Sequence, residues 1–325
     1  MTSTTAVLCA LGTCLPSRIV TNTELASRLN TRPEWIHTRT GIRERHILTP
    51  GTTIADLGEA AARNALTAAT VPHADAVLVT TSTAPRPCPA LAPELAHRLG
   101  LTGAIAYDLN SACSGFIAAA ATALGLILSD LADSVLVVCT EAPSTIIDPT
   151  DRTTTVVLAD GAAAALFRRG TRTEPGALLA LDLGSDGRHC ELIACQGPEG
   201  YLHMDGLAVY ELAPSVMAAS TRRVLAATGW TTADLDTYVP HQANQRIIDN
   251  VVRELALDAG KAVYDIALVG NTSAASIPLA LAHASQHGRP APGHRTVVSA
   301  VGAGFAWGSA ALIWPDHLTS KESLV

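Results

Sequence analysis

The sequence predicts an α/β fold in which buried sheets are covered by helices. Short runs of β-branched and apolar residues, such as AVLVTTS, SVLVVCT and TTVVLA, alternate in the first half with alanine-rich helical stretches such as TIADLGEAAARNALTAA. The same alternation returns after about residue 175, and a polar, turn-rich segment, RRGTRTEPG at 168–176, lies between the two parts. We therefore predict two similar-sized α/β halves, residues 1–170 and 171–325.

The local patterns identify further elements in order along the chain. In the first half a strand ends near Leu109, and the apolar stretch Phe116–Leu128 is typical of a buried helix. In the second half AVYELAPSVMAASTRRVLAATG and ANQRIIDNVVRELAL have the spacing of helices, and DTYVPH is typical of a strand. The segment TVVSAVGAGFAWGSAALIW predicts a strand, a turn that contains Gly302, Gly304 and Gly308, and a second strand.

The composition is that of a globular protein. Of the 325 residues 48% are hydrophobic and 16% are charged, which allows one large core or two fused smaller ones. No run of the sequence approaches the ~20 apolar residues that a membrane-spanning helix needs. The N-terminus has no basic leader before its apolar segment, which argues against a signal peptide. We therefore expect a cytoplasmic protein without a membrane span.

The charge and cysteine patterns argue against several functions. The net charge is −7 and the chain has no basic run, so nucleic-acid binding is not expected. Of the 22 cationic residues only Lys261 and Lys321 are lysines, so a bound phosphate group would depend on arginines or backbone amides. The seven cysteines form no CxxC pair, which indicates neither a disulfide framework nor a metal site.

One cysteine lies where a strand turns into a helix, in DLNSACSGFIAAAATALGLIL. The turn at Asn110 and Ser111 places Cys113 at the helix N-terminus, where amide groups and the helix dipole stabilise a thiolate, the reactive form of the side chain. Gly115 allows the backbone and a ligand to approach closely. This pattern predicts a nucleophile, and the alternative is a buried structural cysteine.

Two polar residues of the second half also follow predicted elements. His241 comes directly after a strand, where an imidazole can exchange a proton near neutral pH; the alternative is a histidine that bonds a backbone carbonyl. Asn271, in LVGNTSAASIPLALAHA, is expected after a strand and before a helix, either as a donor aimed out of the sheet or as a helix cap. The glycine-rich turn is either a plain hairpin or a source of an N–H group for an oxyanion.

Together these segments closely resemble the ketoacyl-ACP synthase III family of the thiolase superfamily. The resemblance extends over nearly the whole chain and includes EWIHTRTGIRERHI, DLNSACSGF, DPTDRTTTVVLADGAAAALF, VPHQAN, GNTSAASIP and GAGFAWGSAALIW. It implies a thiolase-like five-layered αβαβα fold of two duplicated halves, assembled as a homodimer. It also implies a condensing transferase that starts fatty-acid or polyketide chains by joining an acyl-CoA to malonyl-ACP. Both thioesters are substrates, and no cofactor is implied.

The resemblance gives a role to each candidate site residue. Cys113 would be acylated by the acyl-CoA, and the backbone N–H groups of Cys113 and Gly304 would form the oxyanion hole. His241 and Asn271 would hold the carbonyl of the malonyl thioester and stabilise the enolate as carbon dioxide leaves. Two neutral donors suit this step, because charge appears on the carbonyl oxygen only in the transition state.

Three more residues match family positions that bind the adenine end of CoA, namely Trp35, Arg39 and Arg152. An indole and a guanidinium can sandwich a flat base, and arginine suits phosphate. Without the resemblance, Trp35 would be interpreted as a core aromatic residue and the two arginines as members of surface ion pairs.

Two positions depart from the family pattern. Cys88 falls where the family often has a Phe that reaches into the partner subunit's acyl tunnel, so a roomier acyl pocket is expected. Glu211 falls where several members have a lysine near the face that docks ACP, although Arg246 is retained for carrier docking. Arg222 and Arg223, further along the same predicted helix, are candidates to supply the missing positive charge.

Two other functions stay open at this point. In one, the acyl group passes from Cys113 to an alcohol or amine of a small molecule, without decarboxylation. Glu211 favours this alternative, whereas His241 and Asn271 favour condensation. In the other, the chain is a non-catalytic subunit that shapes a heterodimer. Such a subunit would be expected to lack the nucleophile, so Cys113 counts against it.

Overall fold

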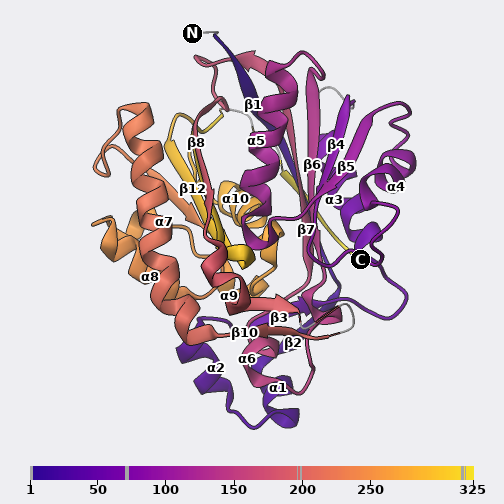
Figure 1. Cartoon of the computed structure of the whole chain (residues 1–325), viewed down its shortest axis with the longest axis vertical. Helices are drawn as coiled ribbons and strands as arrows, with labels where there is room; N and C mark the ends of the chain where they lie inside the picture. The colour runs from indigo at the N-terminus through magenta and orange to yellow at the C-terminus, as the bar shows by residue number, and fades with distance from the viewer. Residues whose placement is uncertain (1–2, 70–72, 196, 198–199, 316–317, 319) are drawn as a thin grey trace.

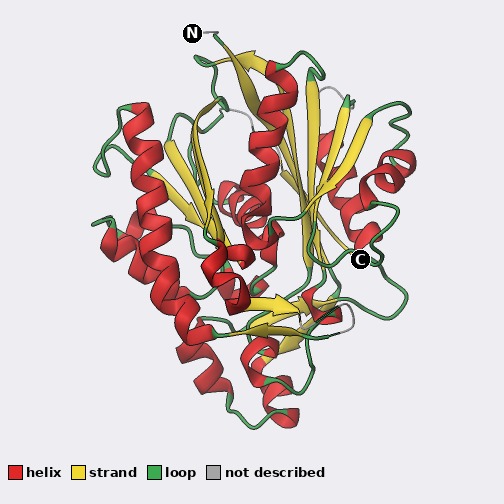
Figure 2. Cartoon of the chain, in the orientation of Figure 1, coloured by secondary structure: helices red, strands yellow, loops and turns green. Residues whose placement is uncertain are grey.

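The protein has five layers, in the order helix, sheet, helix, sheet, helix (Figures 1 and 2). The computed structural model describes residues 3–69, 73–195, 197, 200–315, 318 and 320–325. Figure 1 shows α5 and α10 between the two sheets, α3 and α4 outside the first sheet, and α7 and α8 outside the second. The predicted α/β class is confirmed by this arrangement.

The first sheet has six strands, and their order is β14 (Ser320–Leu324), β1 (Thr4–Leu15), β7 (Gly161–Thr171), β6 (Ser134–Glu141), β4 (Ala76–Thr80) and β5 (Ile105–Leu109). β7 runs antiparallel to both β1 and β6, and the other neighbours are parallel. β14 comes from the end of the chain, so the second predicted half contributes one strand to the first sheet. The division of the chain at residue 170 stays a prediction.

The second sheet has four strands in the order β11 (Thr237–Pro240), β12 (Arg295–Gly302), β13 (Ala306–Ile313) and β8 (Leu178–Ser185). β11 and β12 are parallel, and the remaining pairs are antiparallel. Two small sheets complete the strands, one of β2 (Arg18–Thr21) with β3 (Glu44–Ile47) and one of β9 (Ile193–Cys195) with β10 (Leu202–Met204).

The layer helices are α3 (Ile54–Ala68), α4 (Leu91–Arg98), α5 (Gly115–Leu128), α7 (Gly206–Thr228), α8 (Gln245–Glu254) and α10 (Ser276–Gln286). At one end of the molecule, the lower end in Figure 1, lie α1 (Asn22–Arg28), α2 (Pro33–Thr40) and α6 (Arg152–Thr155). The remaining short helices are α9 (Ile266–Val269) and the 3₁₀ turns η1 (Ala112–Ser114), η2 (Pro143–Thr145), η3 (Gly187–Leu192), η4 (Ala259–Lys261), η5 (Ser273–Ala275) and η6 (Ala303–Phe305). None of the helices in the described ranges is long and apolar enough to cross a membrane.

Local sequence explains where the long helices begin and end. α3 starts at a capping box, in which Thr53 and Asp56 each bond the other's backbone N–H. α7 is capped by the side chain of Asp205 and ends at Gly229, whose φ of 73° suits glycine. Asn244 caps α8, and its Oδ1 accepts from the backbone N–H of Arg246 at 2.9 Å.

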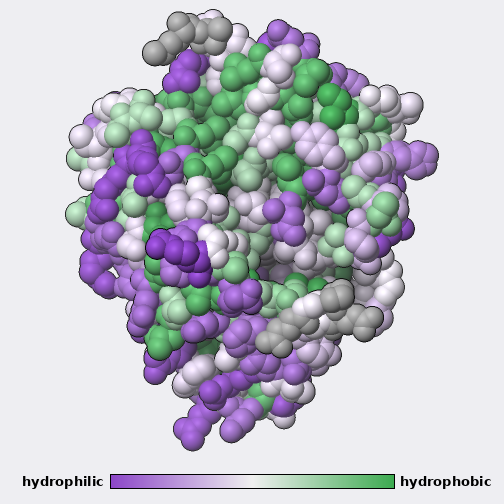
Figure 3. All heavy atoms as spheres, viewed as in Figure 1, coloured by the Kyte–Doolittle hydropathy of each residue, from purple (hydrophilic) through white to green (hydrophobic). Residues whose placement is uncertain are grey.

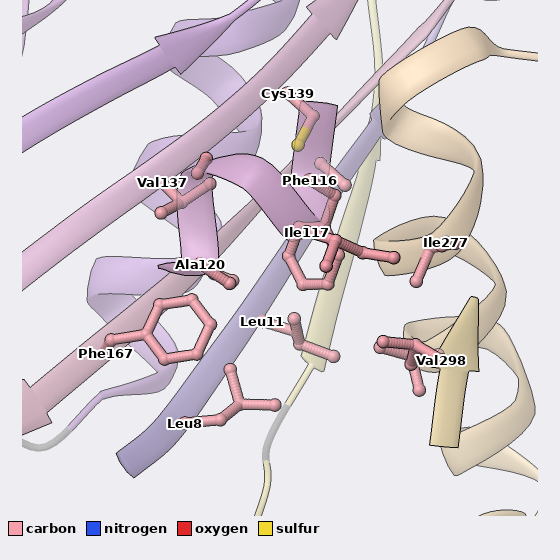
Figure 4. Close-up of a cluster of buried hydrophobic side chains, with 14 of the residues drawn as sticks. Leu8, Leu11, Phe116, Ile117, Ala120, Val137, Cys139, Phe167, Ile277 and Val298 are labelled. Carbon is pink, nitrogen blue, oxygen red and sulfur yellow. The ribbon is translucent and has the colours of Figure 1, made fainter. Parts of the chain in front are cut away.

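The main core lies between the two sheets and surrounds α5. Figure 4 shows Phe116, Ile117 and Ala120 of α5 among buried side chains of β1, β6, β7, α10 and β12. Because α5 is covered by both sheets, it is apolar almost all round, as the sequence predicted. α8 buries one face only, which carries Ile247, Ile248, Val251 and Val252.

Three local predictions were wrong. The run TTVVLA at 154–159 is not a strand, because Asp151 accepts hydrogen bonds from the N–H groups of Thr153 and Thr154 and starts the helical turn α6. Residues 168–171 belong to β7, so the polar connection between the halves is shorter than expected. α9, rather than a strand, precedes Asn271.

Gly308 also differs from the prediction, because it lies inside β13 and not in the turn after β12. A Cβ atom at this position would lie 2.8 Å from Leu183 and 2.9 Å from Ile117. Gly308 is therefore required by the close packing of α5 against the second sheet.

Candidate active site

The candidate site is a cavity of about 640 Å³. Its lining includes residues of α2 and α6, which lie at the lower end of the molecule in Figure 1. Cys113, His241 and Asn271 all line it, as the sequence predicted for a shared site. They come from three places in the fold: η1, the residue after β11, and the residues between α9 and η5. The fold thus brings Cys113 together with two groups that lie more than a hundred residues further along the sequence.

Cys113 lies in the turn that joins β5 to α5. The residue before it, Ala112, has a φ of 43°, a conformation that non-glycine residues rarely adopt and that is often found at functional sites. Gly115 starts α5 so close to β4 that a Cβ atom there would lie 2.0 Å from Thr80 Oγ1. The predicted strand, turn and helix are therefore present, and Gly115 is needed for their close approach.

Burial acts against the thiolate that the helix N-terminus is expected to favour at Cys113. Burial raises the pKa of the Cys113 thiol to about 11; a hydrogen bond with Ser273 lowers it, and the nearby Glu141 carboxyl raises it. The thiol donates to Ser273 Oγ at a distance of 3.6 Å. Cys113 is half-buried at the wall of the cavity.

His241 is buried, and hydrogen bonds hold both its backbone and its ring. Its backbone N–H donates to the carbonyl of Ser299 at 2.8 Å, and its Nδ1 lies 2.5 Å from the hydroxyl oxygen of Ser276 on α10. Burial lowers the pKa of the His241 imidazole to about 3, so the ring is neutral at physiological pH. The alternative of a histidine bonded to a backbone carbonyl does not apply to this side chain.

Asn271 acts partly as the cap that its sequence suggested. Its Oδ1 accepts from the backbone N–H of Ser273 at 2.9 Å, at the start of η5. Its backbone is fixed by hydrogen bonds with Val157 and Ala159 at 3.0 and 2.9 Å. Because the oxygen of the side-chain amide is used in this way, the Nδ2 group is the donor that Asn271 offers to a ligand in the cavity.

The glycine turn between β12 and β13 packs against the turn that carries Cys113. Gly304 has a φ of 118°, which only glycine adopts freely, and its neighbours Ala303 and Phe305 line the cavity. Gly302 is the closer glycine: a Cβ atom there would lie 2.7 Å from the backbone N of Cys113. A side chain at residue 302 would thus cover the N–H group that was predicted to bind an oxyanion.

The predicted CoA-binding residues lie on the same cavity. Arg152 stacks on Trp35, with its Cζ atom 4.8 Å from the ring centroid, and its Nη1 donates to the carbonyl of Asn30 at 3.0 Å. Arg39 also lines the cavity, as does Arg246, which stacks on Tyr210 at 4.8 Å. Trp35 is 39% exposed, so it is not a core aromatic residue.

Two of the predicted positions lie outside the cavity of their own chain. Cys88 is exposed in the loop before α4. Glu211 is exposed on α7, next to Tyr210, which lines the cavity. Arg222 and Arg223 form ion pairs with Glu254 and Asp182, respectively, so their charges are already partnered.

Sequence reasoning placed Gly302 in the glycine-rich turn but not against Cys113, and it gave no role at the site to Glu141, Ser273 or Ser276. Ser273 and Ser276 stand in the quoted GNTSAASIP segment, and that neighbourhood was the one available signal. Within the described part of the chain, no group of three or more His, Cys, Asp or Glu side chains is placed to hold a metal ion.

Comparisons with known proteins point to one family. The family model for 3-oxoacyl-[acyl-carrier-protein] synthase III matches residues 107–187, and the model for the C-terminal part of that family matches residues 225–314. The chain is 46% identical over 324 residues to beta-ketoacyl-[acyl-carrier-protein] synthase III 5 of Streptomyces coelicolor, covering 95% of this chain and 97% of the relative. It is 45% identical over 330 residues to the synthase III of Pseudomonas aeruginosa, covering 98% and 99%.

Solved structures show the same likeness. The 3-oxoacyl-(acyl carrier protein) synthase III of Pseudomonas aeruginosa PAO1 superposes with a TM-score of 0.94 at 45% identity, over 97% of this chain and 100% of the other. The priming beta-ketosynthase of the R1128 polyketide pathway has a TM-score of 0.90 at 35% identity, over 96% and 97%. The predicted thiolase-like fold is confirmed. This chain belongs to the beta-ketoacyl-ACP synthase III family, the condensing enzymes that initiate fatty-acid or polyketide chains.

Proposed function

We propose that this chain takes an acyl group from an acyl-CoA onto Cys113 and joins it to malonyl-ACP with loss of carbon dioxide. One observation supports this most strongly: Cys113, His241 and Asn271 line a single cavity whose other residues include Trp35 and Arg152, the stacked pair expected to hold CoA. The reaction uses two thioester substrates and no cofactor. The cytoplasm, where such substrates are found, stays the predicted location.

In the loading step, the Cys113 sulfur attacks the carbonyl carbon of the acyl-CoA. Negative charge develops on the carbonyl oxygen, and backbone N–H groups stabilise it when they are aimed at its position in advance. We assign this role to the N–H groups of Cys113 and Gly304. Gly302 supports the assignment, because the absence of a side chain there keeps the Cys113 N–H group open to the cavity.

In the condensation step, His241 and Asn271 stabilise the enolate of the malonyl donor. The short contact between Nδ1 of His241 and Ser276 Oγ favours a serine hydroxyl that donates to the ring. We therefore assign the hydrogen of the neutral imidazole to Nε2. Nε2–H of His241 and Nδ2 of Asn271 are then two neutral donors for one carbonyl oxygen, as transition-state stabilisation requires.

Mass spectrometry of the intact protein tests the loading step. Incubation with a panel of acyl-CoAs should add one acyl group, and the Cys113→Ala variant should show no mass increment. The exposed cysteine Cys190, which does not line the cavity, provides the matched control, because its alanine variant should load normally. Full acylation of Cys113→Ala, or a peptide map with the acyl group on another cysteine, would contradict the proposal.

A second candidate function is transfer of the acyl group to an alcohol or amine. The exposed Glu211 on α7 favours it, because an acidic residue at the docking face disfavours an acidic carrier protein. The two functions differ in decarboxylation. Release of carbon dioxide from malonyl-ACP, coupled to ketoacyl product, supports condensation, and acyl transfer without it supports this second candidate.

We also propose that the protein is a homodimer. β5 is an edge strand of the first sheet, and its apolar side chains Ile105, Tyr107 and Leu109 are only partly buried. Leu128, at the end of α5, is 48% exposed. Figure 3 shows apolar residues gathered on the face where Figure 1 draws α5.

Sedimentation velocity tests the proposed homodimer. It should give a dimer for the wild type and a monomer for Tyr107→Asp, and a monomeric wild type would contradict the proposal.

A further inference from the structure

A buried carboxyl group lies directly behind the nucleophile. Glu141 is the last residue of β6, and its side chain is fully buried. Its Oε2 atom accepts hydrogen bonds from Thr81, Ser82 and Thr83, in the loop after β4, at 3.0 to 3.2 Å. Its Oε1 atom accepts from the hydroxyl of Ser273 at 2.9 Å. The partners that the described residues supply to this carboxyl group are hydroxyls and an amide, and none is a cation.

Ser273 connects this carboxyl group to Cys113. A serine hydroxyl has one hydrogen, and Ser273 donates it to Glu141, so the same oxygen can only accept from the Cys113 thiol, 3.6 Å away. Ser273 is held in place by a hydrogen bond from its N–H to Asn271 Oδ1, and its φ of 51° is strained for a residue with a side chain. The result is one directed chain of hydrogen bonds, from thiol to hydroxyl to carboxylate.

The thiol proton of Cys113 has its route through Ser273 to Glu141, because neither His241 nor Cys139 can accept it. His241 is neutral, and its Nδ1 is occupied by Ser276, so with the hydrogen on Nε2 it has no free acceptor atom. Cys139, two residues before Glu141 on the same strand, points into the apolar core with Phe116 (Figure 4). Burial raises the pKa of Glu141 by more than its hydrogen-bond donors lower it, which makes its carboxylate a better proton acceptor.

We propose that Ser273 and Glu141 store the Cys113 proton while the enzyme carries an acyl group, an inference that rests on the proposed function. When the Cys113 sulfur bonds to the acyl carbon, its proton passes to Ser273 Oγ, and the Ser273 hydroxyl proton passes to Glu141 Oε1. The bond between the acyl carbon and the CoA sulfur breaks, and the CoA thiolate takes a proton from water. Ser273 contacts the reacting sulfur, and Glu141 is a positioning residue that acts through it.

The condensation step reverses the transfer. The enolate carbon of the decarboxylated donor bonds to the acyl carbon, and the bond from that carbon to the Cys113 sulfur breaks. The stored proton returns from Glu141 through Ser273 to the sulfur, which restores the thiol. Over one cycle the two side chains are therefore unchanged, and one proton from water ends on CoA.

Rapid-quench measurements of acyl loading against pH test this proposal. In the wild type, loading should slow on the acid side as Glu141 becomes protonated before the acyl-CoA arrives. Glu141→Gln and Ser273→Gly should load about 10²-fold more slowly and should lose this acid limb. Ser273→Gly also relieves the strained φ, so it keeps the test usable where Glu141→Gln folds poorly. Asp160→Asn, another fully buried carboxyl group without a contact to Cys113, is the control that should keep the wild-type pH profile.

Infrared spectroscopy provides a readout that a structural role would not change. The difference spectrum of acylated minus free enzyme should gain a protonated carboxyl band, and Glu141→Gln should lack it. Folded Glu141→Gln and Ser273→Gly variants with the wild-type rate and pH profile would overturn the relay and leave Cys113 acylation intact. The absence of acylation in the wild type would overturn the proposed function instead.

Discussion

His241 and Asn271 both line the cavity, and in the mechanism proposed above they act as neutral donors in condensation and not in loading. Replacement of either residue by alanine should leave acylation of Cys113 largely intact, because its oxyanion is stabilised by backbone N–H groups. The rate of decarboxylation of the malonyl donor should fall by about 10²-fold or more, which is the usual loss of rate when one oxyanion donor is removed. Single-turnover mass spectrometry measures loading, and release of labelled carbon dioxide from malonyl-ACP measures condensation. Unchanged turnover in both variants would show that the chemistry is not malonyl condensation.

At the scale of residues, functional side chains could be identified from the sequence where they follow a predicted strand. Cys113 and His241 each follow a predicted strand, and a strand end directs its next side chain outward. Glu141 escaped notice because it is simply the last residue of a strand until the fold brings Ser273 against it. The effect of burial on the pKa of Cys113 was not predicted for the same reason, because burial depends on the surrounding elements and not on the helix that begins beside it.

At the scale of elements, one histidine ties the last strand to the rest of the fold. His283 on α10 contacts Asp265 at 3.0 Å through Nδ1 and Glu322 of β14 at 2.5 Å through Nε2. Burial lowers the pKa of His283, but the hydrogen bonds and charges of these carboxylates outweigh burial and raise it to about 10. The hydrogen bond with His283 lowers the pKa of Glu322. We therefore expect the attachment of β14 to depend on pH.

The sign of this dependence follows from the two shifts. A raised histidine pKa stabilises the folded state fully below the usual value of 6.5, and this contribution is lost as pH rises through about 10. A lowered carboxyl pKa stabilises the folded state above the usual value of 4.5, and this contribution is lost as pH falls. His283→Gln should thus reduce the free energy of unfolding most between pH 4.5 and 6.5. Urea unfolding at about pH 5.5, 7.5 and 9.5 measures this, with His97→Gln as the exposed control; an equal loss at every pH would contradict it.

Long periodic segments were predicted correctly, and so were the short strands β4, β6 and β11, but the short run at 154–159 was not. α5, α7 and α8 carry enough turns for their apolar residues to define a face, and the strands around them are β-branched and apolar. The run at 154–159 has the composition of a strand, but a single capping side chain, Asp151, folds its first residues into a helical turn. Strand propensity depends on partners, and no partner is visible in a short sequence window.

At the scale of the whole molecule, the loop that carries Cys88 is attached to the edge of the first sheet. Asp108 on β5 accepts from the N–H groups of Leu91 and Ala92, both at 2.7 Å, and so fixes the start of α4 beside that edge. A dimer formed along β5 would bring this loop toward the partner subunit. The predicted place of Cys88 at the partner subunit's acyl tunnel is compatible with this position and stays a prediction.

Chain-length preference tests that prediction. A cysteine in place of a phenylalanine leaves room for a longer or branched acyl chain, and each buried methylene contributes about 0.8 kcal/mol. The wild type should therefore load chains longer than acetyl preferentially, and Cys88→Phe should shift the preference to short chains. Cys190→Phe, at another exposed cysteine, is the control. Mass spectrometry with mixed acyl-CoAs measures the preference, and a wild type that loads acetyl best would count against the assignment.

We predict that recognition of an acidic carrier protein depends on the charge around the cavity mouth. Arg246 offers a positive charge there, stacked on Tyr210, but the next residue of α7 is the exposed Glu211. Arg222 and Arg223 do not compensate, because each is paired with a carboxylate. An acidic carrier is steered by an uncompensated positive rim, so we expect weak use of ACP that falls further with salt.

Glu211→Lys should therefore raise kcat/KM for malonyl-ACP by about a factor of ten at low salt, mainly through faster association. It should leave kcat/KM for malonyl-CoA unchanged, because that donor has no acidic protein surface to dock. The double variant Arg222→Ala, Arg223→Ala should use ACP as the wild type does, since both arginines are already paired. Steady-state kinetics with both donors across a salt series make the comparison. Efficient use of ACP by the wild type that survives loss of both arginines would place the docking face away from Glu211, because the charge that attracts the carrier must then lie elsewhere on the molecule.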